Sequence, residues 1–422
     1  MLRSMFAGVS GLRSHQAYMD IVGNNIANVN TTGYKSSSAL FEDLLSQSLR
    51  GAGAPADATQ GGTNPAQVGL GVKLGAVQMN MAQGASQLTG RSTDFAIQGD
   101  GLFVVDVAGT RAYTRAGSFS LDGLGQLVTP EGGFLQGWQA DSQGNVNTNA
   151  GVGLLKVPVG QTIAPVTTKN IVLGGNLPSE TATAATLNVS PTIYNSLGTK
   201  VPIRVEFTKI ANGAATINWQ VRTYDAANNV LAGPTALTFD LTGERTTPNI
   251  TLTQAQLNAI AGTSGTWPAG GIVIGMGLPG AADRMTGASG LNSAGFLSQD
   301  GSGIGSLVSF SVSQQGLISG VFSNGRNQAL GQMALAVFAN PTGLEKAGNS
   351  LYRSSVNSGE PQIGIPGGGG RGTIAGGTLE MSNVDLAGEF TNLIVAQRGF
   401  QANSRIITAS DEILQDLVNL KR

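Results

Sequence analysis

The chain has 422 residues, enough for two to four domains, and a formal net charge of −1 at neutral pH. No basic block is present, so the electrostatic attraction that dominates nucleic-acid binding is missing, and without cysteine there are no disulfides or thiolate metal sites. No apolar run matches a secretory signal or a membrane span, so we expect a chain that stays in the cytosol or is exported by another route. With 62 glycines, 12 % charged and 41 % apolar residues, the composition favours a β-rich body with many turns.

Residues 1–33 are predicted to contain a long amphipathic helix. Apolar side chains alternate there at steps of three and four, a heptad pattern that forms one seam along a helix: Met5, Val9, Leu12, Met19 and Ile26. The asparagine-rich end of this segment predicts the stop, because Asn and Gly tolerate the left-handed conformation that ends helices.

Residues 34–71 and 363–380 are predicted to be connectors. The first holds a loop rich in glycine, alanine and proline between Gly51 and Pro65, and the second holds four successive glycines from Gly367. Such compositions are typical of flexible links.

Between the connectors, alternating apolar residues and turn signals predict β-structure. We expect residues 72–150 and 289–362 to form one inner β domain, with a meander from Phe95 to Trp138 and turns at Gln315–Gly316 and Asn324–Gly325. Residues 151–288 have strand patterns of their own and are predicted to be an outer β domain inserted into the inner one. The predicted plan is nested, and it brings the two chain ends together.

The last segment, residues 381–422, is predicted to form a second long helix. Its apolar residues repeat at every seventh position: Leu386, Leu393, Phe400, Ile407 and Leu414. Ser382 and Asp385 are expected to start it, the serine as the cap and the carboxylate in the first turn. We expect the two terminal helices to form a coiled-coil domain. Either the pair packs on the chain's own core, or neighbouring copies complete it.

No pattern argues for catalysis. The single histidine, His15, has no nearby serine or acid at a catalytic spacing. Gly69–Gly75 matches a dinucleotide fingerprint only loosely, and Asp141, Asn145 and Asn147 lack the acid that would end a calcium loop. We therefore expect no catalytic, cofactor or metal residues, and a chain that is not an enzyme.

Two motifs at opposite ends resemble the bacterial flagellar rod and hook proteins. The first motif comprises Asn24, Asn25, Asn28, Thr31, Gly33, Tyr34 and Lys35. The second comprises Asn383, Asp385, Gln397, Arg398, Gln401 and Asn403. Residues 93–103, 114–119 and 338–346 are also similar to that family. Two motifs at the two ends are more specific than either one alone.

The resemblance implies a self-assembling structural subunit of the flagellum. Within the family, the inserted domain and the stretch Thr192–Gly198 resemble the hook members, whose terminal helices would line a central channel of a bent tube that transmits torque. By resemblance the partners are other copies of the chain, the distal rod, the hook cap, the hook–filament junction proteins and the flagellar type III export apparatus. A distal rod subunit, or a secreted β-protein that binds or hydrolyses glycans, is the alternative.

Overall fold

The computed structural model describes residues 2–54, 61–160, 162–260, 262–277, 281 and 284–419, so Met1 and residues 420–422 of the predicted terminal segments lie outside it. The chain divides into two compact units. The first comprises residues 1–157, 310–319 and 329–422, and the second comprises residues 158–309 and 320–328. Along the described residues, no helix has the length and apolar character needed to cross a membrane.

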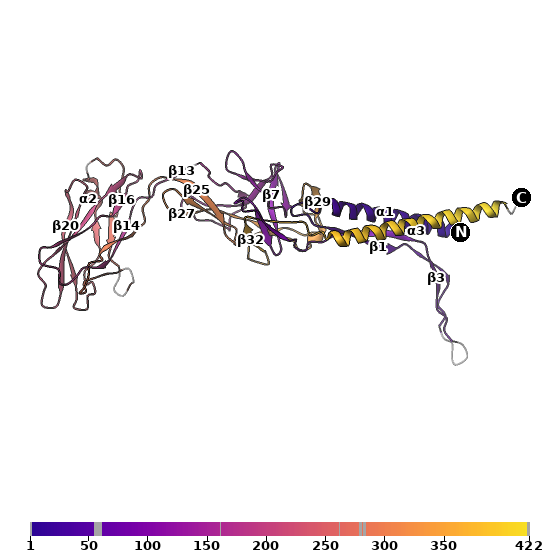
Figure 1. Ribbon diagram of the computed structural model, residues 1–422, viewed down its shortest axis with the longest axis horizontal. Coiled ribbons are helices and arrows are strands. Elements are labelled where there is room, and N and C mark those ends of the chain that lie inside the picture. Colours follow the sequence, from indigo (N-terminus) through magenta and orange to yellow (C-terminus); the bar gives the residue numbers. More distant parts are fainter. Residues whose placement is uncertain are drawn as a thin grey trace. The chain divides into compact units, whose positions relative to one another are not determined.

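Two long helices and a set of short strands make up the first unit (Figure 1). The helices are α1 (Leu2–Ala27) and α3 (Leu386–Asn419). The strands before the second unit are β1 (Ser37–Asp43), β2 (Ser46–Arg50), β3 (Ala66–Gly69), β4 (Val72–Met79), β5 (Ser86–Leu88), β6 (Phe95–Gln98), β7 (Leu102–Val107), β8 (Thr110–Thr114), β9 (Ser120–Leu121), β10 (Leu127–Val128), β11 (Phe134–Gln139) and β12 (Gly153–Leu154). Those after it are β28 (Leu335–Val337), the 3₁₀ turn η2 (Pro341–Gly343), β29 (Glu345–Gly348), β30 (Leu351–Arg353), β31 (Gln362–Gly364), β32 (Thr373–Gly376) and β33 (Thr378–Glu380).

The stretches expected to be connectors contain paired strands. In the first, β1 pairs antiparallel with β4, and β2 pairs with β3, so the chain forms a two-stranded ribbon. In the second, β32 pairs with β6 and β33 pairs with β5. The high glycine content of these stretches made them look like loops. Their hydrogen-bonding partners also lie far away in the sequence, so no local pattern predicted the strands. Residues 55–60 of the first stretch lie outside the described residues.

The inner β body is only partly the meander that the sequence suggested. Strands β7 and β8 form a hairpin, and β11 returns beside β7. Strand β6, which the alternation placed next to β7, pairs with β32 instead. Its Phe95 and Ile97 are fully buried. The two ends of the chain therefore both contribute strands to this unit.

The second unit is an all-β fold with one short helix. Its elements are β13 (Thr162–Ile163), β14 (Asn170–Asn176), β15 (Thr186–Val189), β16 (Thr192–Tyr194), β17 (Lys200–Pro202), β18 (Arg204–Lys209), β19 (Ile217–Tyr224), β20 (Val230–Phe239), β21 (Ile250–Leu252), α2 (Gln254–Asn258), β22 (Ile272–Gly275), β23 (Met285–Thr286) and β24 (Gly295–Gln299). Strict alternation of buried and half-buried residues along β19 places Trp219 in an apolar core with Phe207 and Phe239. The core also takes residues from β14 and β22.

Strands β25 (Gly305–Val312), β26 (Leu317–Phe322) and β27 (Asn327–Met333) each have residues in both units. The turns between them lie where the sequence predicted, since Gly316 N–H donates to Ser313 and Gly325 N–H donates to Phe322. The predicted outer domain, residues 151–288, overlaps the second unit but ends earlier. The four-part domain division remains a prediction.

We expect the second unit to fold independently. A fragment of residues 158–328 should unfold cooperatively in denaturant, because it retains the whole apolar core around Trp219. Phe207→Ala should lower its free energy of unfolding by about 3–5 kcal/mol, since that ring is fully buried. Leu241→Ala, at a side chain that is 72 % exposed, is the control and should change it by less than about 0.5 kcal/mol. A fragment without a cooperative transition would contradict this division.

Candidate functional site

The two terminal helices pack side by side and antiparallel, with α1 in indigo and α3 in yellow (Figure 1). We call the line along which the two helices touch the contact line, and several of its residues are small. A Cβ atom on Gly8 would lie 3.3 Å from Ile407, and one on Gly399 would lie 2.5 Å from the ring of His15. A Cβ atom on Gly11 would lie 2.7 Å from the side chain of Asn403. Glycine at these positions leaves room for the Ile407, Asn403 and His15 side chains between the helices.

The predicted heptad seams lie beside this contact line, with one exception. Val9 and Leu12 follow the buried residues Gly8 and Gly11, and Phe400 follows Gly399. One position along a helix is a rotation of about 100°. Ile407 is the exception, because its side chain contacts the position of Gly8. Most seam residues therefore do not lie on the line where α1 meets α3, and the coiled-coil domain stays a prediction.

Both seams turn to the same side of the pair. On each helix the seam residue follows a contact-line residue by one position. Because the helices are antiparallel, this rotation carries the seam of α1 and the seam of α3 to the same side of the pair. The seam side chains that are half-buried are Met5, Val9, Leu12, Met19, Ile26, Leu393, Ile407 and Leu414. Leu386 and Phe400 are 40 % and 36 % exposed. Ile407 belongs to the contact line, and we call the other nine residues the seam face.

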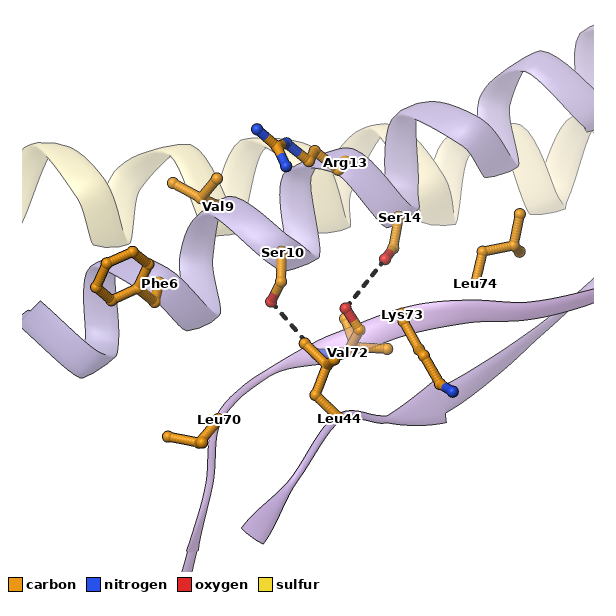
Figure 2. A pocket seen from close by; sticks show the side chains of 10 residues that line it. All are labelled: Phe6, Val9, Ser10, Arg13, Ser14, Leu44, Leu70, Val72, Lys73 and Leu74. Atoms are coloured by element: carbon orange, nitrogen blue, oxygen red, sulfur yellow. Dashed lines mark hydrogen bonds between the residues drawn. The ribbon is translucent and has the colours of Figure 1, made fainter. Parts of the chain in front are cut away.

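The β1–β4 ribbon packs against a different side of α1. Val72 N–H donates to Ser10 Oγ at 3.3 Å, and Ser14 Oγ donates to Val72 O at 3.4 Å (Figure 2). Figure 2 shows both serines pointing down to the strand, whereas Val9 points away from it. An apolar cavity of about 480 Å³ lies between α1 and this ribbon. Ser10 and Ser14 thus hold the ribbon on α1, and Val9 lies at the edge of their contact and also lines the cavity.

Asp385, rather than Ser382, caps α3. The Asp385 carboxylate accepts from Ala387 N–H at 3.1 Å, and its carbonyl accepts from Glu389 N–H. Ser382 Oγ accepts from Val384 N–H at 3.4 Å, before the helix starts. An aspartate is at least as good a cap as a serine, and its charge also favours the positive end of the helix dipole.

The N-terminal motif forms a hydrogen-bonded junction between α1, α3 and the β body. Asn25 is its centre: its amide donates to Ser37 O at 2.8 Å and to Glu389 Oε1 at 3.0 Å, and its oxygen accepts from Tyr34. Asn24 donates to the Tyr34 hydroxyl. The sequence motif therefore marks the place where three segments meet.

The turn after α1 completes this junction. Asn28 Nδ2 donates to Asn24 O, and Thr31 Oγ1 donates to Asn28 Oδ1. Gly33 N–H then donates to Glu380 O at 2.8 Å. Glycine is required at this position, because φ is +66° and a Cβ atom would lie 2.5 Å from Ala116 N.

Asn383 joins the start of α3 to the β body. Its carbonyl oxygen accepts from Ser36 N–H at 2.8 Å, and its amide donates to the carbonyls of Asn80 and Ala82 at 2.9 Å each. The remaining C-terminal motif residues lie farther along α3, outside the junction. Gln397, Arg398 and Gln401 are exposed, and Asn403 is on the contact line with α1.

A buried ion cluster lies beneath the junction. Lys35 Nζ is 2.7 Å from Glu380 Oε1, and Arg115 Nε is 2.5 Å from Glu380 Oε2. The exposed fraction of the side chain is 1 % for Lys35, 5 % for Arg115 and 0 % for Glu380. Gly84 N–H donates to the same carboxylate. The N-terminal motif included Lys35, and Arg115 lies in the similar stretch 114–119, but the pairing of both with Glu380, 345 residues from Lys35, leaves no local pattern.

The cluster stays ionised around Glu380. Burial alone would raise the pKa of this carboxyl, but the charge of Arg115 and hydrogen bonds from Lys35, Arg115 and Gly84 hold the pKa below its ordinary value of 4.5. Burial lowers the pKa of Lys35, against the opposing effect of Glu380. Burial also raises the pKa of Tyr352 to about 12, so its hydroxyl stays neutral at pH 7.

The residues weighed as catalytic or metal candidates make structural contacts. His15 lies between the helices and against the ring of Phe41, 6.0 Å away. Asp141 accepts hydrogen bonds from Gln143 and Asn145 within one turn, as an Asx turn does. Within the described residues, no group of three or more His, Cys, Asp or Glu side chains is placed to hold a metal ion.

The sequence matches three family profiles. Residues 5–35 match the flagella basal body rod protein, residues 96–190 match the D1 domain of the flagellar hook protein FlgE/F/G, and residues 375–420 match the C-terminal region of the flagellar basal body rod FlgEFG protein. The first and last profiles contain most of α1, all of α3, Lys35 and Glu380. The paired terminal helices, the junction and these matches define a subunit of the flagellar rod and hook class.

Full-length relatives narrow this class. The chain is 38 % identical over 448 residues to the flagellar hook protein FlgE of Borreliella burgdorferi and 37 % identical over 464 residues to that of Treponema pallidum, with all of each chain covered. It is 33 % identical over 423 residues to the flagellar basal-body rod protein FlgG of Bacillus subtilis, also with full coverage. The Helicobacter pylori hook protein FlgE2 structure has a TM-score of 0.48 at 16 % identity, covering 68 % of this chain and 98 % of that one. The chain belongs to the flagellar hook protein family, whose members are structural proteins of the bacterial flagellum.

Glu380→Gln tests the ion cluster. The substitution leaves two buried cations without their shared counter-charge, so the free energy of unfolding of the first unit should fall by about 3–5 kcal/mol in calorimetry. Glu42→Gln is the matched control, because the Glu42–Lys73 pair is about half exposed on both sides and should contribute less than about 1 kcal/mol. Equal effects of the two variants would show that burial of the cluster has no energetic consequence.

The same carboxyl predicts acid sensitivity. Because the pKa of Glu380 in the folded chain is below 4.5, its stabilising contribution is complete above pH 4.5 and is lost as the pH falls through the folded value. Unfolding of the first unit between about pH 5 and pH 2 should therefore be steeper for the wild type than for Glu380→Gln. Parallel curves for the two proteins would contradict this assignment.

Proposed function

We propose that this chain builds the flagellar hook by helical self-assembly and that the seam face is the main surface between neighbouring terminal helix pairs. Full-length identity to hook proteins of two organisms supports the hook assignment. The position of the seam face supports its role as the surface between neighbouring helix pairs. Its heptad repeat runs along two helices but is not used as the line on which they pack against each other.

An apolar repeat of this length needs a helical partner. Burying half-exposed Leu, Ile, Met and Phe side chains gains about 25 cal/mol per Å² of apolar surface, and seven-residue spacing is the geometry by which helices supercoil around one another. A second helix pair provides such a surface. If the contact joins two different faces and does not close, identical copies build a helical tube.

The rest of the subunit suits a tube that bends. Charged residues are only 12 % of the chain and aromatic residues 5 %, so contacts between β domains would break few ion pairs and displace few large anchors as copies slide. We propose that residues 151–288 form an outer layer that tunes bending, with residues 72–150 and 289–362 as the inner β domain. Residues 1–33 and 381–422 would line the channel.

The same proposal names the partners by family. The ends of the polymer would contact the distal rod, the hook cap and the hook–filament junction proteins, and the subunit would leave the cell through the flagellar type III export apparatus. A rod function is the second candidate, favoured by the full-length match to the Bacillus subtilis rod protein. Loss of the gene separates the two: a hook subunit leaves complete rods without hooks, whereas a rod subunit leaves no complete rod.

Phe400→Asp tests the seam face. An aspartate there would be buried without a partner between two helix pairs, at a cost of several kcal/mol, so tubes should be absent from electron micrographs of the purified protein. Circular dichroism should show that the subunit itself remains folded. Thr391→Asp places the same charge on the opposite side of α3, where it is exposed, and should still give tubes. Normal tubes from Phe400→Asp would refute this assignment.

A further inference from the structure

The buried ion cluster does not balance in charge. Lys35 and Arg115 supply two positive charges and Glu380 supplies one negative charge. Tyr352, close by, is neutral. A buried net charge is costly unless another group of opposite sign compensates it.

Each cation also retains one unused donor. A lysine ammonium has three N–H groups, and Lys35 uses two of them, toward Ala82 O and Glu380. Arg115 has five N–H groups. It donates to Glu380 and to the carbonyls of Ile97, Gly99 and Gly101, which accounts for four. Within the described part of the chain, the remaining N–H of each side chain has no acceptor.

Both cations line one cavity. It has a volume of about 280 Å³, enough for a small anion together with water, and its wall includes Met81, Leu102, Phe338 and Pro341. Asp100 is the one acid among the lining residues. It is exposed, and among the described residues it makes no ion pair with either cation.

We propose that this cavity binds a small monovalent anion, of the size of chloride or acetate, between Lys35 and Arg115. The anion would accept the two unused N–H donors and neutralise the excess charge. Its source can be a free halide or a carboxylate, since both supply one charge and an acceptor. Binding would stabilise the junction beneath the terminal helices, so the stability of the first unit would depend on which anion is present, at constant ionic strength. This inference does not rest on the hook assignment.

The test compares full-length monomers at pH 7 in gluconate, chloride and acetate at one ionic strength, by calorimetry of the first unit. In the wild type, chloride or acetate should raise the midpoint in a saturable way, and anion at ten times its Kd should lower the unfolding equilibrium constant about elevenfold. Lys35→Met leaves Glu380 and Arg115 as a balanced pair and should lose this dependence. Lys346→Met removes an exposed lysine outside this cavity and should retain it.

Two results would overturn the proposal: no saturable response in the wild type, or the same response in Lys35→Met. If Lys35→Met does not fold, chloride-35 NMR of the wild type decides. Exchange into the site should broaden the bulk chloride resonance, and acetate should reverse the broadening. A line width that acetate leaves unchanged would also refute the site.

Discussion

One buried carboxylate holds together the place where both terminal helices join the β body. Glu380 ends β33, five residues before Asp385 caps α3, and it pairs with Lys35, which follows α1, and with Arg115, which follows β8. A buried charge tolerates little displacement, because losing either partner leaves ions unpaired in a low-dielectric interior. The positions of both terminal helices on the β body are therefore fixed by an interaction that joins three distant segments.

Fixing the junction also fixes what the helix pair exposes. Asn25 and Asn383 tie α1 and α3 to the same strands, and Gly8, Gly11 and Gly399 leave room for side chains between the helices. In this arrangement glycines and Asn403 occupy much of the contact line. Larger apolar residues such as Leu386 and Phe400 are left partly exposed and available to other copies. A subunit can thus be folded by itself and still carry an apolar surface suited to a polymer.

The sequence predicted the features that leave a local pattern, namely heptad repeats and turn signals. Heptads located both helices, and Gly316 and Gly325 located the turns that join β25, β26 and β27. It did not predict which face of each helix meets the other. A seam residue and the residue before it differ by a rotation of only about 100° around the helix axis. The contact face is determined by glycines, which do not appear in a hydrophobic pattern. The strands at 373–380 were missed for a related reason, since their pairing with residues 86–98 is set by tertiary contacts. Lys35 was recognised as part of a motif, but its partners Glu380 and Arg115 could only be found in space.

The most direct test of this account is a cryo-electron microscopy reconstruction of tubes grown from the purified chain. We expect Lys35, Arg115 and Glu380 to remain paired within each subunit, and the seam-face residues Leu393 and Phe400 to be buried against the terminal helices of a neighbouring copy. A tube in which these residues face the channel water, while the opposite side of α3 makes the contacts between copies, would contradict it.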